Sequence, residues 1–87
     1  MKACILYRPK SEFARMVEDY ARDFKRTKAL DIELIDLNTR EGDSKAKLYD
    51  IVRYPCLMIV QENGQLIKNW QGENFPLMNE LAVYLHQ

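Results

Sequence analysis

The residues from 51 to 72 constrain the fold of this chain more than any other stretch. Pro55 stands directly before the apolar run Cys56–Val60, which has the length of a strand. Proline lacks a backbone N–H, so it is tolerated at the first residue of a strand but not in the middle of one. The dipeptide Asn63-Gly64 favours a tight hairpin turn with positive φ at both residues, and 66–70 then returns as a second strand. This stretch therefore predicts two antiparallel strands that are entered through a proline.

The length and charge of the chain exclude several classes of protein. With 87 residues it is long enough for one domain, which we expect to span 1–87. Thirteen Lys and Arg residues balance thirteen Asp and Glu residues. A neutral chain without a basic cluster lacks the electrostatic footprint of proteins that bind nucleic acid or an anionic membrane. No apolar run has the length of a membrane span and no secretory signal is visible, so we expect a cytoplasmic protein.

The first half of the chain has the pattern of a strand, a helix and a second strand. The apolar runs 1–7 and 31–37 predict strands that are covered on both faces. Between them, apolar residues recur at helical spacing after Ser11, which we expect to be the N-cap, with Glu12 in the first turn. These apolar residues are Phe13, Met16, Val17, Tyr20, Ala21 and Phe24. A βαβ unit of this kind joins two parallel strands through a right-handed crossover.

The second half adds two helices to the hairpin. Residues 38–43 are polar and predict a turn, and 44–49 predict a short helix. The inward side of this helix carries Ala46, Leu48 and Tyr49. Pro76 suits the first position of a last helix, because its missing N–H would have no partner there. The apolar side of that last helix contains Leu77, Met78, Leu81, Ala82, Tyr84 and Leu85. The order β-α-β-α-β-β-α predicts an α/β fold in which helices flank a four-stranded mixed sheet.

That order, with Asp50–Pro55 before the third strand and Asn63-Gly64 in the hairpin, resembles the thioredoxin superfamily. The resemblance is clearest over 36–72 and looser over the rest of the chain, whose size is close to that of glutaredoxins. It implies a thioredoxin-like fold with a cis peptide bond between Tyr54 and Pro55. It also implies that the backbone of Tyr54 pairs with an extended substrate peptide.

The chain departs from the superfamily at the junction of the first strand and first helix. There the superfamily has a Cys-x-x-Cys motif, in which the helix N-terminus lowers the pKa of the first thiol. Here residues 8–15 read Arg-Pro-Lys-Ser-Glu-Phe-Ala-Arg and contain no cysteine. Neither a dithiol nor a monothiol mechanism can be carried over, and Ser11, the closest polar substitute, cannot form a mixed disulfide. We therefore assign no catalytic residue at this junction.

The two cysteines, Cys4 and Cys56, each have two interpretations. Cys56 follows Pro55 and could be a glutathionylated or redox-sensing thiol, or a small buried residue at the start of a strand. Free cysteines are most often buried. Cys4 stands in the middle of an apolar strand, so we expect burial there as well. In this fold Cys56 would lie beside Tyr7, which leaves Cys4 beyond the limit of about 7 Å between bridged Cα atoms. We predict two free thiols.

Basic residues could form a positive rim around the N-terminus of the first helix. Arg8, Lys10 and Arg53 would then suit a carboxylate or a phosphate, such as the carboxylates of glutathione. The alternative is a solvated rim that is balanced by Glu12, since exposed charges are the norm.

Aromatic residues offer a second kind of candidate surface. Tyr7, Tyr54 and Trp70 could contact a peptide, because aromatic side chains are common anchors in interfaces. The alternative for Trp70 is half-buried packing, on the same strand face as Leu66 and Lys68.

The leading hypothesis is a non-catalytic domain that binds a protein or peptide, as some thioredoxin-fold adaptors without Cys-x-x-Cys do, circadian-clock adaptors among them. Its expected binding surface consists of Arg8, Lys10, Ser11, Glu12, Tyr54 and Pro55. The rival hypothesis is a degenerate glutaredoxin-like protein that uses Cys56 for thiol redox chemistry or binds glutathione. A third is self-association through an exposed sheet edge, and we expect a monomer or weak homodimer. We expect no metal or other cofactor, because the spacing of candidate ligands fits none and His86, the only histidine, stands at a helix end.

Overall fold

The computed structural model describes residues 1–86 and has the predicted order of elements. These are β1 (Lys2–Tyr7), α1 (Ala14–Lys28), β2 (Ile32–Asp36), α2 (Arg40–Leu48), β3 (Cys56–Val60), β4 (Leu66–Gln71) and α3 (Met78–Leu85). The strand order in the sheet is β2-β1-β3-β4. β1 pairs parallel with β2 and antiparallel with β3, and β3 pairs antiparallel with β4. The predicted α/β fold with a mixed four-stranded sheet is therefore confirmed.

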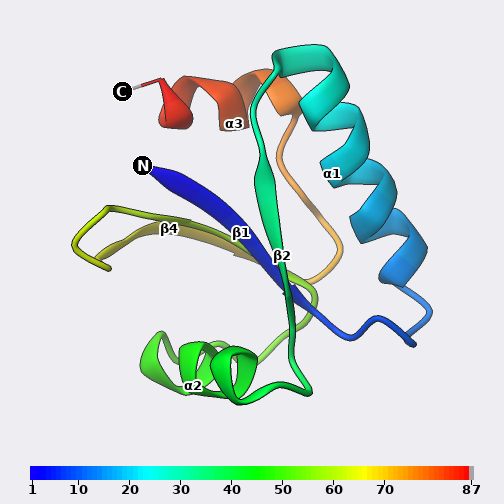
Figure 1. Ribbon diagram of the computed structural model, residues 1–87, viewed down its shortest axis with the longest axis vertical. Helices are drawn as coiled ribbons and strands as arrows, with labels where there is room; N and C mark the ends of the chain where they lie inside the picture. Colours follow the sequence, from blue (N-terminus) through cyan, green and yellow to red (C-terminus); the bar gives the residue numbers. More distant parts are fainter. Residues whose placement is uncertain (87) are drawn as a thin grey trace.

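Helices cover both faces of the sheet, and for that reason the central strands are apolar from Ala3 to Tyr7 in β1 and along the whole of β3. α1 and α3 lie on one face and α2 lies on the other (Figure 1). Along β1, Ala3, Ile5 and Tyr7 face the core beneath α1 and α3, whereas Cys4 and Leu6 face the core beneath α2. This alternation is the two-residue period of a strand, and it gives the chain two cores. No helix within residues 1–86 is long and apolar enough to cross a membrane.

α1 begins later than the sequence predicts. Its N-cap position is Phe13 and no side chain caps it, so the prediction of Ser11 as N-cap is wrong. The Ser11 hydroxyl and the Ser11 N–H both donate to Arg8 O, at 2.7 and 3.1 Å. Serine has closed a local turn with the backbone in place of capping the helix, and Glu12 therefore lies before the first helical turn.

α2 begins earlier than predicted, within the segment that we had expected to be a turn. Thr39 is its N-cap: the Thr39 hydroxyl accepts from Gly42 N–H at 3.1 Å and donates to Asp36 O at 2.6 Å. Ala46 is buried as expected, but Leu48 is 70% exposed, so its predicted inward position is wrong. Helical spacing explains this error, because Leu48 lies two residues after Ala46 and is therefore about 200° around the helix from it.

The β3–β4 hairpin is not the predicted tight turn. Gly64 has φ of 89°, but Asn63 does not have positive φ. Gly64 N–H donates to Gln61 O at 2.9 Å, and Gln61 N–H donates to Gln65 O at 2.8 Å. This is the pattern of a longer loop with a glycine at its end, which is accompanied by a bulge in the ladder.

The bulge changes which residues of β4 share a face. The register shifts between Ile59 and Val60, so that Val60 pairs with Leu66 but Ile59 pairs with Lys68. Leu66 consequently packs on the α2 side, whereas Trp70 packs on the side of α1 and α3. The prediction that Leu66 and Trp70 share a face is wrong, because the extra residue inverts the alternation.

α3 begins at Met78, so Pro76 precedes the helix and does not occupy its first position. Pro76 is buried, and its carbonyl accepts from the Tyr20 hydroxyl at 2.9 Å. Leu77, which we had assigned to the apolar side of the helix, is 79% exposed. Leu81 and Ala82 are buried as expected and tie α3 to the core that it shares with α1.

Candidate functional site

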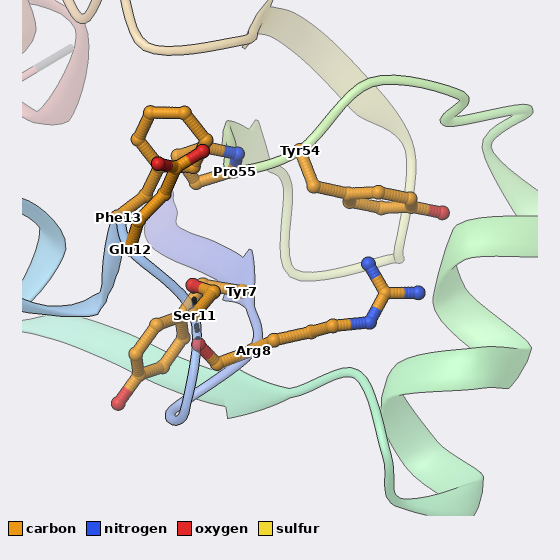
Figure 2. Close-up of a pocket in the computed structure, with 7 residues that line it drawn as sticks. All are labelled: Tyr7, Arg8, Ser11, Glu12, Phe13, Tyr54 and Pro55. Atoms are coloured by element: carbon orange, nitrogen blue, oxygen red, sulfur yellow. Dashed lines mark hydrogen bonds between the residues drawn. The ribbon is translucent and has the colours of Figure 1, made fainter.

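A cavity of about 420 Å³ lies where the end of β1, the start of α1 and the loop before β3 meet. We call it the Tyr54 cleft, and it is lined by Tyr7, Arg8, Ser11, Glu12, Phe13, Tyr54 and Pro55 (Figure 2). Five of the six residues predicted as a binding surface line it, whereas Lys10 is exposed outside it. Helical spacing had assigned Phe13 to the apolar face of the helix, so the sequence did not identify it as a lining residue.

Arg8 and Tyr54 form a cation–π pair on one side of the cleft. The guanidinium carbon of Arg8 lies 5.4 Å from the centroid of the Tyr54 ring. The Tyr54 hydroxyl donates to Ile51 O at 2.9 Å, which fixes the ring. Within residues 1–86 no carboxylate lies within 4.0 Å of the Arg8 side-chain nitrogens. A guanidinium has five N–H donors, so those that do not face the ring can donate to a ligand.

The two charged side chains of the cleft lie apart. Figure 2 shows the Arg8 guanidinium on the side of Tyr54, and the Glu12 carboxylate on the side of Phe13 and Pro55. Tyr7 also lines the cleft, but Figure 2 shows its ring pointing away from Tyr54, and its hydroxyl donates to Glu18 Oε2 at 3.1 Å. Burial, together with this hydrogen bond, raises the pKa of Tyr7. The cleft thus has aromatic walls with a positive and a negative group on different sides.

The loop that carries Tyr54 is held by the end of β4. Gln71 Oε1 accepts hydrogen bonds from Val52 N–H at 3.2 Å and from Arg53 N–H at 3.1 Å. Gly72 N–H donates to Pro55 O at 2.8 Å, and the Tyr54–Pro55 peptide bond is cis, as the resemblance implies. Within residues 1–86 the N–H and C=O of Tyr54 have no backbone partner. The loop is therefore fixed on both sides of a residue whose own backbone is free to pair.

The positive rim considered from the sequence does not assemble around the cleft. Arg8 lines the cleft, but Lys10 and Arg53 do not. The Arg53 guanidinium lies over Gly72, where a Cβ would come within 3.0 Å of Arg53 Nη2. Gly72 also has φ of 90°, so a residue with a side chain would be strained there, whereas the flexible end of Arg53 could move aside.

The two thiols lie in the core on the α2 side of the sheet and outside the cleft. Both cysteines are free, as predicted, and their exposed fractions are 2% for Cys4 and 0% for Cys56. Burial raises the pKa of Cys4 to about 11 and that of Cys56 to about 12. Because the thiolate is the reactive form of cysteine, these thiols are kept in their unreactive state.

The other candidates from the sequence lie elsewhere. Trp70 is half-buried and makes an edge contact with Tyr84, with ring centroids 5.8 Å apart. His86 is exposed at the end of α3. No group of three or more His, Cys, Asp or Glu side chains within residues 1–86 is arranged to hold a metal ion.

Comparison with solved structures identifies the architecture. Over 99% of its length the chain is similar to thioredoxin 1 from Thermosipho africanus, with a TM-score of 0.70 and 21% identity over 96% of that protein. The chain has the thioredoxin fold. It is also similar to mitochondrial thioredoxin 3 from Saccharomyces cerevisiae, with a TM-score of 0.69 and 16% identity over 97% of this chain and 74% of that one.

A third similar chain belongs to the complex of ferredoxin:thioredoxin reductase with thioredoxin f2. The TM-score is 0.65 and the identity 15%, over 98% of this chain and 76% of that one. No protein-family model and no curated protein matches the sequence. At these identities the likeness concerns the fold, so the function must be argued from the residues of this chain.

Proposed function

We propose that this protein is a non-catalytic module that binds an extended segment of a protein or peptide in the Tyr54 cleft. One observation carries the proposal: Tyr54 has an unpaired backbone at the wall of an aromatic cavity, while the loop on either side of it is pinned. A peptide that pairs with a free backbone gains main-chain hydrogen bonds, and adjoining pockets for its side chains supply specificity. The Arg8 guanidinium beside the same residue can donate to a carbonyl or carboxylate of the peptide.

The fixed geometry of the cleft supports this use. The hydrogen bonds of Gln71, Gly72 and the Tyr54 hydroxyl hold the loop before any ligand arrives. A binding site that is already ordered loses less conformational entropy when it binds. The cleft is thus built to receive a segment without rearranging.

The rival redox function has little support from the cysteine that it requires. A redox-active Cys56 would need an exposed thiol with a lowered pKa. Cys56 is instead fully buried, and its pKa is raised to about 12. We therefore propose no redox step and no glutathione cofactor. Two free thiols suit a reducing compartment, so we place the protein in the cytoplasm.

The proposal is tested by selecting peptides on the folded protein. A phage-displayed library of random peptides roughly 16 residues long, which extend to about 50 Å, is panned on the wild-type protein. The enriched peptide is then labelled with fluorescein, and its Kd is measured by anisotropy. Tyr54→Ala and Arg8→Ala should each weaken binding by about tenfold or more, because aromatic and arginine side chains dominate binding energy.

Lys25→Ala is the matched control, since it removes one positive charge from an exposed position in the last turn of α1, far from the cleft, and its ion-pair partner Asp31 lines neither the cleft nor any other hollow of α1. It should leave the Kd unchanged, and circular dichroism should show that all variants are folded. Failure to enrich any peptide, or equal binding to wild type and Tyr54→Ala, would contradict the proposal.

A further inference from the structure

A second hollow adjoins the Tyr54 cleft along α1. This α1 groove has a volume of about 580 Å³ and is lined mainly by Glu12, Met16, Asp19, Tyr20, Asp23 and Met78. Glu12 lines both the groove and the cleft, so the two hollows meet at this residue. A segment that leaves the cleft past Glu12 therefore enters the groove.

The floor of the groove is apolar and partly adaptable. Met16, Tyr20 and Met78 are half-buried beside the core under α1 and α3. Tyr20 is fixed, because its hydroxyl donates to Pro76 O at 2.9 Å and its ring makes an edge contact with Phe75. The two methionines have flexible, polarisable side chains, which fit apolar groups of varied shape. The floor can thus receive one apolar side chain of a partner.

The rim of the groove is mostly acidic. It carries the carboxylates of Glu12, Asp19 and Asp23 against the single guanidinium of Arg15. Asp19 and Asp23 also contact Arg22 and Arg26 on the same helix, in exposed ion pairs of the kind that contribute little stability. These carboxylates can therefore turn to a lysine or arginine of a partner at little cost.

We propose that the partner segment has two parts, an extended part in the Tyr54 cleft and a continuation in the α1 groove. The continuation places an apolar side chain on Met16, Tyr20 and Met78, with a neighbouring lysine or arginine facing the acidic rim. From Met16 to Asp23 the helix rises about 10 Å, which about three extended residues span. This inference rests on the proposed function, and it adds the chemistry of the partner.

The test compares the enriched 16-residue peptide with its two halves on the wild-type protein. Amide shifts in NMR spectra show which half contacts the Tyr54 cleft. The whole peptide should bind about tenfold or more tightly than this cleft half, since burial of one large apolar side chain is worth at least that factor. Asp19→Lys and Met16→Gln should remove this advantage, while the cleft half binds both variants as it binds wild type.

Asp43→Lys is the matched control, because Asp43 is an exposed aspartate whose own ion pair lies within α2, on the opposite face of the sheet. It should preserve the advantage of the whole peptide. Replacing the basic residue of the peptide with glutamate should restore tight binding to Asp19→Lys, which a purely structural effect of the substitution would not do.

The outcomes separate this inference from the function on which it rests. If the cleft half binds as tightly as the whole peptide, or if the advantage survives in both groove variants, the α1 groove is not part of the interface. The proposed function then stands alone. If no peptide is enriched, or if Tyr54→Ala leaves the Kd of the enriched peptide unchanged, the proposed function is contradicted. The inference that rests on it is then contradicted as well.

Discussion

The side chain of Gln71 is placed to order the Tyr54 cleft without lining it. Its carbonyl oxygen accepts from two consecutive N–H groups of the loop, those of Val52 and Arg53. Gln71→Met keeps the size of the side chain but removes the acceptor. We expect the free energy of unfolding to fall by about 1 kcal/mol, because the two exposed N–H groups recover part of their bonding from water. Urea unfolding measures this change.

Gln71→Met should also weaken binding of the enriched peptide several-fold. A loop that is less ordered before binding loses more conformational entropy when it binds. Gln71→Glu keeps an oxygen at the acceptor position and should retain the affinity, although it loses the hydrogen bond that Gln71 Nε2 donates to Asn69 Oδ1 at 3.2 Å and with it part of the stability. Unchanged affinity in Gln71→Met would show that the loop is ordered without this side chain. The sequence could not reveal the role of Gln71, because it depends on contacts across separations of 18 and 19 residues.

The thiol of Cys56 should be inert in the folded protein. Its sulfur is fully buried and its pKa is raised to about 12, so neither access nor thiolate is available near neutral pH. We expect iodoacetamide to modify Cys4 and Cys56 at rates that rise steeply only when urea unfolds the chain, with mass spectrometry as the readout. Rapid modification of Cys56 in native buffer, with a midpoint below the free-thiol value of about 8.5, would instead revive the redox hypothesis.

At the scale of elements, α2 is positioned by a close contact between its first turn and the end of β2. A Cβ on Gly42 would lie 2.2 Å from Asp36 O and 2.9 Å from Leu37 Cα. Helix propensity alone predicts that Gly42→Ala stabilises by about 1 kcal/mol. We expect the opposite, a loss of about 1 to 3 kcal/mol, because the helix must move away from backbone atoms that cannot yield.

Urea unfolding of Gly42→Ala and Ser44→Ala separates the two effects. Ser44 is exposed on the same helix, so its replacement reports propensity without the steric contact. Ser44→Ala should be neutral or slightly stabilising. If Gly42→Ala proves as stable as Ser44→Ala, α2 can move away from β2 at a lower cost in free energy than the distances in the structure indicate.

The strands were more predictable than the helix starts. β3 has the predicted bounds, because the proline before the apolar run fixes where the strand begins and the end of the run fixes where it ends. The start of α1 was wrong since Ser11 could cap a helix or close a turn, and only the fold around Arg8 selects the turn. The start of α2 was missed although Thr39 is of a common N-cap type, because the polar residues around it also suit a turn.

The residues of the candidate site were likewise predictable only in part. The resemblance placed Tyr54 and Pro55 beside Arg8, Ser11 and Glu12, and the fold bears out that proximity. The α1 groove was not predicted, because helical spacing assigned its floor residues Met16, Tyr20 and Met78 to the core. They are only half-buried, and spacing along a helix cannot distinguish full from partial burial.

At the scale of the whole molecule, the sheet separates the α1 groove from the thiols. The α1 groove lies along α1, whereas Cys4 and Cys56 lie in the core on the α2 side, against which Tyr54 also packs (Figure 1). Neither cysteine lines the Tyr54 cleft, so the thiols influence the stability of the fold and not the chemistry of the cleft. This separation gives a prediction about pH.

The buried thiols should make the protein less stable as the pH rises above about 9. In the unfolded chain they lose their protons near the free-thiol pKa of about 8.5, whereas in the folded chain they keep them up to a pKa of about 11 for Cys4 and about 12 for Cys56. The folded state then binds more protons, so the free energy of unfolding falls with increasing pH. Each thiol contributes at most roughly 1.4 kcal/mol per pH unit in this range.

Urea unfolding between about pH 7 and about pH 10 measures this loss before lysines titrate strongly. Cys56→Ala should be less stable at every pH, because it leaves a small cavity, but its stability should decline less steeply above about pH 9. The slope isolates the thiol, since the cost of the cavity does not depend on pH. Equal slopes for wild type and Cys56→Ala would mean that the pKa of Cys56 is about the same in the folded chain as in the unfolded chain. Cys56 would then not be the inert thiol that its burial indicates.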